Sequence, residues 1–144
     1  MKTIFLVEDD PVVVKVYAAK FVREGFHVEV AQDGLIALRM LTTAKPDIMV
    51  LDLMMPKLNG VDVLKFVRSN PALKELPVII LSNAHMTSLA QAAAEFGVER
   101  ALLKSSCTPS QLIEVINDLL SGKTGDTDPS MRLAVRTPPP KPQT

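Results

Sequence analysis

Short apolar runs alternate along the chain with longer segments in which apolar residues recur at helical spacing. The apolar runs, which we predict to be β-strands, are residues 3–8 (TIFLVE), 27–31 (HVEVA), 47–52 (DIMVLD), 77–82 (PVIILS) and 100–104 (RALLK). The third and fourth runs are almost continuously apolar, which is typical of strands covered on both faces. Strands that alternate with helical segments predict an α/β fold, with a doubly wound parallel sheet and helices on both faces.

The helical segments carry signals at their ends. Residues 108–111 (TPSQ) offer an N-cap, a proline at the first helical position and a capping-box partner for the last helix. Gly122 is a suitable stop for that helix, and Asp10 with Pro11 opens the first helix in the same way. The apolar face of the last helix comprises Leu112, Ile113, Ile116, Leu119 and Leu120.

Composition narrows the class of protein. The 16 basic residues balance the 16 acidic ones, so no global field favours nucleic acid or an anionic membrane as a partner. No apolar run approaches the roughly 20 residues that span a bilayer. The single cysteine, Cys107, cannot form an internal disulfide, and we therefore expect a cytoplasmic protein.

The chain changes character near residue 122. Residues 122–144 contain 5 of the 11 prolines and no sustained apolar period, which is typical of a flexible tail or linker. We predict one folded domain over residues 1–121 and a proline-rich tail over residues 122–144.

Polar residues end four of the five predicted strands. The first strand runs into Glu8, Asp9 and Asp10, and the third ends in Asp52. The fourth ends in Ser82 and the fifth in Lys104. In an open parallel sheet the carboxyl ends of the strands meet at the edge where ligands bind, so we expect these side chains to lie together.

A cluster of carboxylates needs a counter-charge, since two of them about 4 Å apart repel by about 4 kcal/mol at an effective dielectric of 20. Oxygen ligands without a thiolate or imidazole suit Mg²⁺. One of the clustered aspartates could then act as a nucleophile toward a phosphoryl group, which Mg²⁺, the Lys104 ammonium and the Ser82 hydroxyl would stabilise. Each polar residue alone also has an ordinary structural explanation, and we assign Asp10 mainly to helix capping.

The same residues resemble the receiver domain of two-component response regulators. The matching segments are LVEDD (6–10), DIMVLDLMMPKLNG (47–60), VIILSNA (78–84) and ALLK (101–104), in the family's order. The resemblance covers about residues 2–121 and implies a flavodoxin-like (βα)5 sheet with strand order 2-1-3-4-5.

The resemblance also implies roles for individual residues. Asp52 would be the phosphoacceptor, and Glu8, Asp9, Asp52 and the backbone carbonyl of Met54 would hold Mg²⁺. Ser82 and Lys104 would stabilise the phosphoryl group and operate the switch. The donor would be the phosphohistidine of a sensor histidine kinase or phosphotransfer protein. The chain would catalyse only its own phosphorylation and slow dephosphorylation. It would act through an output domain or downstream protein, and the resemblance leaves open whether it forms a homodimer.

Three departures from the family pattern bear on this reading. Ser105 follows the lysine where the family usually has proline, and Ala101 stands where the family has its switch aromatic residue. We therefore expect intact phosphorylation with an altered or weak readout. Asn83, next to Ala84, stands where a small residue often leaves room for the phosphoryl group, so we expect these two positions to control access.

Other functions remain as alternatives. A phosphorylation-independent interaction module with the receiver fold is favoured by Ala101 and Ser105 and opposed by the full acid–lysine set. A phosphatase with an aspartate nucleophile would normally have a second acid two residues later, where this chain has Met54. A flavin protein would need a hydroxyl- or glycine-rich loop after the first strand, where this chain has EDDPVV (8–13).

Overall fold

The computed structural model describes residues 1–55, 57–82 and 87–122, with the side chains of residues 87–90 left aside. The strands are β1 (Thr3–Val7), β2 (His27–Ala31), β3 (Ile48–Asp52), β4 (Val78–Ser82) and β5 (Arg100–Leu103). The helices are α1 (Pro11–Arg23), α2 (Gly34–Leu41), α3 (Gly60–Ser69), α4 (Thr87–Phe96) and α5 (Pro109–Leu120), and a short 3₁₀ turn, η1 (Lys104–Ser106), precedes α5.

All the strand pairs are parallel, and the sheet order is β2-β1-β3-β4-β5. This is the predicted flavodoxin-like order. Each predicted strand agrees with the structure to within one residue at either end. The central strands β3 and β4 are buried at every position, as their apolar runs predicted.

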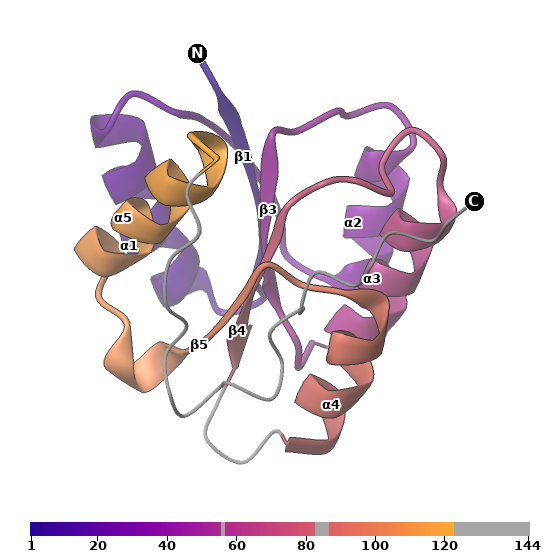
Figure 1. Cartoon of the computed structure of the whole chain (residues 1–144). Coiled ribbons are helices and arrows are strands. Elements are labelled where there is room, and N and C mark those ends of the chain that lie inside the picture. The colour runs from indigo at the N-terminus through magenta and orange to yellow at the C-terminus, as the bar shows by residue number, and fades with distance from the viewer. Residues whose placement is uncertain (56, 83–86, 123–144) are drawn as a thin grey trace.

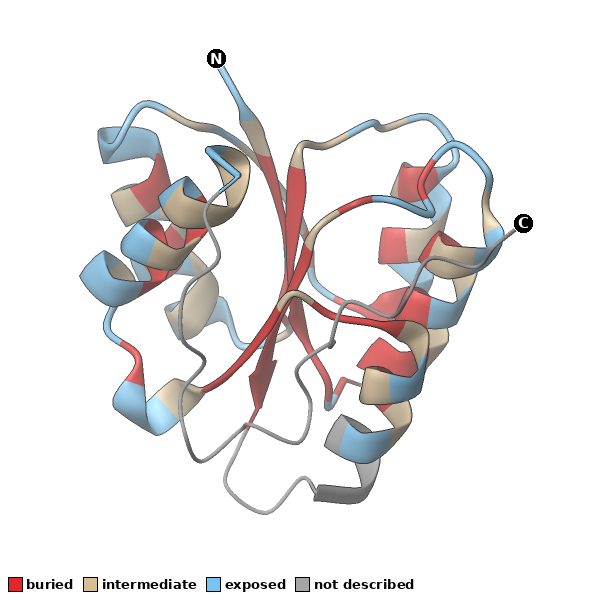
Figure 2. Cartoon of the chain, in the orientation of Figure 1, coloured by how far each residue is buried: buried red, intermediate tan, exposed pale blue. Residues whose placement is uncertain are grey.

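Helices cover both faces of the sheet. Figure 1 shows α1 and α5 against one face and α2, α3 and α4 against the other. Alternate residues of each strand enter two separate cores: in β1, Phe5 faces the core under α2, α3 and α4, while Ile4 and Leu6 face the core under α1 and α5. Buried residues follow the strands and the inward sides of the helices (Figure 2).

Local sequence sets where the helices begin. Asp10 caps α1 by accepting a hydrogen bond from the Val12 N–H at 2.9 Å, with Pro11 at the first helical position. Thr108 and Gln111 form the predicted capping box of α5. After α5, the predicted stop residue Gly122 has φ +85°, a conformation that glycine adopts without strain.

In the described part of the chain, no helix has both the length and the apolar character needed to cross a bilayer.

Candidate functional site

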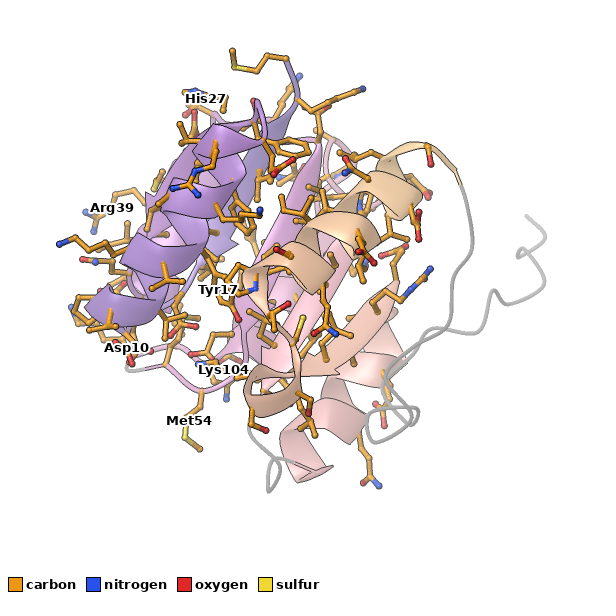
Figure 3. The ribbon with its side chains drawn as sticks, turned by 90° about the vertical axis from the view of Figure 1, so that its left-hand side faces the viewer. Asp10, Tyr17, His27, Arg39, Met54 and Lys104 are labelled. Atoms are coloured by element: carbon orange, nitrogen blue, oxygen red, sulfur yellow. The ribbon has the colours of Figure 1, made fainter. Side chains whose placement is uncertain are left out.

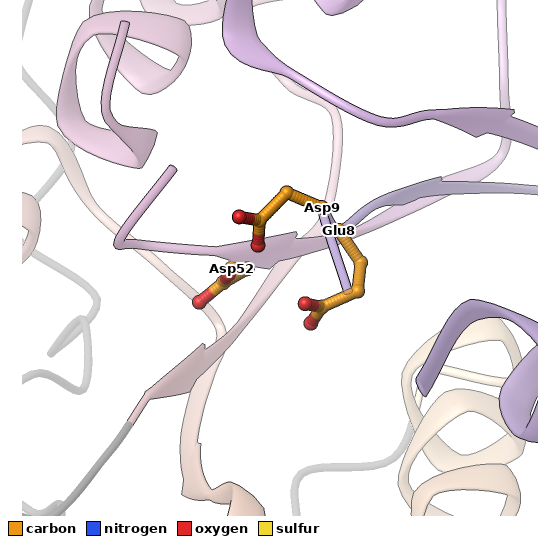
Figure 4. Close-up of side chains that lie close together, drawn as sticks. All are labelled: Glu8, Asp9 and Asp52. Atoms are coloured by element: carbon orange, nitrogen blue, oxygen red, sulfur yellow. The ribbon is translucent and has the colours of Figure 1, made fainter. Parts of the chain in front are cut away.

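Three acidic side chains meet at the carboxyl ends of β1 and β3. Oxygen atoms of Glu8, Asp9 and Asp52 all lie within 4.8 Å of one another, and Figure 4 shows the three carboxylates close together. Glu8 and Asp52 are buried, with exposed fractions of 0% and 3%, whereas Asp9 is more accessible. The parallel register brings this about, since Val7, at the end of β1, lies opposite Leu51, just before Asp52.

Lys104 brings an ammonium group to the same edge from the end of β5. Its Nζ lies 3.0 Å from Glu8 Oε1 and 3.3 Å from Asp52 Oδ1. In Figure 3, Lys104 lies near Asp10 and Met54 at one end of the molecule, with His27 at the opposite end. The strand-end acids and the lysine, far apart in sequence, are therefore brought together as the topology predicted.

Burial and charge perturb the ionisation of this cluster. Burial, followed by the nearby charge of Glu8, raises the pKa of Asp52 to about 7, although Lys104 and the Met54 N–H act in the opposite direction. Burial lowers the pKa of Lys104, but the Asp52 and Glu8 carboxylates outweigh that effect, so the lysine pKa is raised. Lys104 is therefore held in its charged form, whereas the ionised form of Asp52 is disfavoured.

The loop after β3 holds Asp52 in place. The Met54 N–H donates to Asp52 Oδ1 at 3.3 Å, and the Met54 side chain is 55% exposed. Gly60, at the start of α3, donates its N–H to the Leu53 carbonyl at 2.8 Å, and a Cβ there would lie 2.6 Å from the Asp52 carbonyl oxygen. Only glycine fits this close backbone approach.

Two contacts, one in the cluster and one beside it, were not predicted from the sequence. The Asp10 N–H donates to Glu8 Oε2 at 3.1 Å, so the start of α1 helps to orient Glu8. The Tyr17 hydroxyl donates to the Cys107 carbonyl at 3.5 Å, just beyond the turn that begins with Lys104. The spacing of Tyr17 and Phe21 on one helix face was the only sequence signal for a buried aromatic pair on α1.

Some of the remaining residues singled out in the sequence lie within the described part of the chain and others do not. Ser82 ends β4, next to β3, and is fully buried. Ala101 is fully buried in the core under α2, α3 and α4, and Ser105 is exposed within η1. Asn83 and Ala84 lie outside the described residues, so their expected control of access has no structural account.

The cluster suits a hard divalent cation. Three carboxylates face one ammonium group, and Glu8 Oε1, although ion-paired with Lys104, is a buried oxygen without a hydrogen bond. Mg²⁺ accepts carboxylate and carbonyl oxygens as ligands. Asp9 is the accessible member of the cluster, so a cation could reach the site from its side. A second positive charge would relieve the excess negative charge and favour the ionised form of Asp52.

The sequence matches the profile of the response regulator receiver domain over residues 4–117. Among curated relatives, a probable transcriptional regulator, ycf29, of Pyropia yezoensis is 33% identical over 118 residues, which are 82% of this chain and 53% of that protein. The response regulator MprA of Mycobacterium bovis (strain BCG / Pasteur 1173P2) is 32% identical over 130 residues, 90% of this chain and 56% of MprA. The chain thus spans about half the length of these relatives.

Solved structures agree with the sequence matches. The receiver domain of a Francisella response regulator is 30% identical, with a TM-score of 0.75 over 84% of this chain and 98% of that one. The signal receiver domain of a histidine kinase from Syntrophus aciditrophicus is 26% identical, with a TM-score of 0.78 over 85% and 92% of the two chains. The sheet order, the clustered strand-end residues and these matches together place the chain in the response regulator receiver domain family.

Proposed function

We propose that this chain accepts a phosphoryl group on Asp52, in a reaction that depends on Mg²⁺, and that the modification switches the binding of a partner. The observation that carries the proposal is the convergence of Glu8, Asp9 and Asp52 with the Lys104 ammonium at one sheet edge. Carboxylates and a lysine arranged in this way can hold a cation and stabilise a transferring phosphoryl group.

The chemistry is a transfer to a carboxylate. An oxygen of ionised Asp52 attacks phosphorus, the bond between phosphorus and the imidazole nitrogen of a phosphohistidine breaks, and the electron pair and a proton restore neutral histidine. The donor would be a sensor histidine kinase or phosphotransfer protein. Hydrolysis by water would later release inorganic phosphate and regenerate the Asp52 carboxylate.

Each residue of the cluster has a defined task in this proposal. Glu8, Asp9, Asp52 and the Met54 carbonyl would hold Mg²⁺, which supplies positive charge to the phosphoryl oxygens when bound. Lys104 would move its contact from Asp52 toward the phosphoryl oxygens, because phosphorylation replaces the carboxylate charge with a larger one. The Ser82 hydroxyl, at the neighbouring strand end, would donate to the same group.

The domain would act as a signalling switch inside the cytoplasm. The tail or linker predicted from the sequence lies outside the described residues, apart from Gly122. Phosphorylation adds close to two negative charges at a buried edge, which biases an equilibrium between conformations that partners distinguish.

Acetyl phosphate tests the proposal directly. Purified protein with acetyl phosphate and Mg²⁺ should gain the mass of one phosphoryl group, and EDTA or Asp52→Asn should abolish the gain. Asp10→Asn is a matched control, since it removes a carboxylate next to the cluster while asparagine still caps α1. This control should be phosphorylated normally. A folded wild-type protein that gains no mass, or an Asp52→Asn variant that still does, would contradict the proposal.

A second candidate is an interaction module that works without phosphorylation. It is favoured by the buried Ala101, which is too small to act as a switch ring, and by the exposed Ser105 next to Lys104. In that case a partner would bind the wild type and Asp52→Asn with the same affinity, whether or not acetyl phosphate is present. Different affinities would exclude this alternative.

A further inference from the structure

Tyr17 joins α1 to the chain that follows Lys104. Its side chain is 6% exposed and stacks on Phe21, with ring centroids 6.1 Å apart and planes at 5°. The hydroxyl donates to the carbonyl oxygen of Cys107, a residue 90 positions away in sequence, at 3.5 Å. A buried tyrosine needs a partner for its hydroxyl, and here the partner is the backbone between β5 and α5.

The connection from β5 to α5 is short and is held at both ends by the same part of the molecule. Lys104 begins the turn η1, and its ammonium contacts Glu8 at the end of β1. Cys107 follows the turn and is held by Tyr17 on α1, the helix that comes directly after the acidic residues. The lysine and the tyrosine therefore anchor the two ends of one four-residue segment.

This segment has no residue that restricts its backbone by itself. The two positions after Lys104 are Ser105 and Ser106, both exposed, and serine leaves φ free where proline would fix it. The carbonyl contact with Tyr17 is then a tertiary contact that limits how the turn, and with it the lysine backbone, can move.

We propose that Tyr17 is a positioning residue for Lys104, whose hydroxyl, by holding the Cys107 carbonyl, keeps the turn in the conformation that directs the ammonium toward Glu8 and Asp52. The catalytic consequence rests on the proposed phosphorylation of Asp52, but the positioning itself does not. A change at Lys104 must then alter the surroundings of Tyr17, and a change at Tyr17 must alter the position of Lys104, because coupling between two sites is reciprocal.

A spectroscopic test is independent of phosphorylation. The chain contains one tyrosine and no tryptophan, so protein labelled with ¹³C at the tyrosine Cζ gives a single resonance, from Tyr17. Lys104→Met, which keeps side-chain length and loses the charge, should shift this resonance. Lys15→Met is the matched control: it removes the charge of an exposed lysine only two residues from Tyr17 and should leave the resonance in place. An unchanged resonance in Lys104→Met would overturn the proposal.

A kinetic test addresses the consequence. Tyr17→Phe keeps the stacked ring and should slow phosphorylation by acetyl phosphate about threefold to tenfold, the factor expected for one neutral hydrogen bond. In a Lys104→Met background, Tyr17→Phe should have almost no further effect. Phe21→Leu removes the ring that stacks on Tyr17 but no hydroxyl, so it controls for loosened packing of α1. It should change the rate of phosphorylation by the same factor in both backgrounds.

The two tests separate two kinds of failure. A Tyr17→Phe effect of the same size in both backgrounds would show a general structural role and overturn the proposal. If the wild type takes up no phosphoryl group, the proposed function fails, and the resonance of Tyr17 in Lys104→Met still decides whether the tyrosine and the lysine are coupled.

Discussion

Lys104 Nζ lies 3.3 Å from Oδ1 of Asp52, and this contact joins the ends of β5 and β3 across the intervening strand β4. The Asp52 side chain is 4% exposed and that of Lys104 22% exposed, so water screens the pair only in part. The ammonium therefore lowers the free-energy cost of burying the Glu8 and Asp52 carboxyl groups when no metal ion is bound.

Lys104→Met should destabilise the protein in EDTA, because the buried Glu8 and Asp52 carboxyl groups would lose the positive charge that faces them. We expect a loss of about 1–3 kcal/mol in the free energy of unfolding, below the full cost of breaking a buried pair because Lys104 is partly exposed. Urea unfolding measures the loss. Saturating Mg²⁺ should restore most of it, and an equal loss with and without Mg²⁺ would speak against a cation at this cluster.

The Asp52 pKa of about 7 predicts how pH acts on the metal-free protein. The folded-state pKa lies above the ordinary carboxyl value of 3.8, so the group favours folding fully below pH 3.8, and this contribution is lost as the pH rises through about 7. Compared with Asp52→Asn, the wild type in EDTA should become progressively less stable between pH 4 and pH 7. Urea unfolding of both proteins across this range measures the difference, and parallel pH profiles would contradict the prediction.

Mg²⁺ affinity should follow the same ionisation. At the proposed site, Mg²⁺ binding would require the Asp52 carboxylate, so the affinity should fall as the pH drops below about 7 and level off above it. Calorimetric titration with Mg²⁺ at several pH values checks this, and proton release on binding should be largest below pH 7. An affinity that is constant between pH 5 and pH 8 would show that Asp52 does not need to lose a proton.

Arg68 should be important for stability although it lies away from the site. Its guanidinium donates to the carbonyls of Phe96 and Gly97 at the end of α4 and to those of Lys74 and Leu76 before β4. Arg68→Ala leaves these carbonyls without their donor and should cost about 3 kcal/mol, measured by urea unfolding. Arg68→Lys should recover less than half, because an ammonium cannot reproduce the planar fork. Arg39→Ala, at an exposed position of α2, should be nearly neutral.

Gly34→Ala should disturb the loop that carries Met54. A Cβ at Gly34, the first residue of α2, would meet the backbone oxygen of Leu58 and lie 2.6 Å from its Cβ. The backbone would have to move, at a cost of about 1–3 kcal/mol. Urea unfolding should show this loss together with weaker Mg²⁺ binding, whereas Leu35→Ala, at the neighbouring exposed position, should change neither much.

Tyr17 gives a prediction at alkaline pH. Burial, then Cys107 and Glu8, raises the pKa of Tyr17 to about 12. The phenolate absorbance of this single tyrosine should therefore appear with a midpoint near 12 rather than near the ordinary value of about 10. Because the folded pKa is raised, the stabilising contribution is complete below pH 10 and is lost as the pH rises through about 12. A midpoint near 10 in folded protein would mean that the hydroxyl is exposed.

The sequence by itself determined the order of the elements, the limits of the strands and the starts of two helices. Alternation of apolar runs with helical spacing predicted the five strands to within one residue, and the N-cap residues Asp10 and Thr108 marked helix starts. These signals are local, because periodicity and capping depend on residues a few positions apart. The strand-end position of Glu8, Asp52 and Lys104 also follows from sequence once a parallel sheet is accepted, although their roles stay predictions.

Only the tertiary structure decided which of these groups touch. Glu8 and Lys104 lie 96 positions apart, and Tyr17 and Cys107 lie 90 apart, yet both pairs join the β1–α1 and β5–α5 regions. The carbonyl groups around Arg68 likewise come from two separate segments, residues 74–76 and 96–97. Such contacts depend on how helices pack on the sheet and on where backbone groups point, and no local pattern encodes either of these.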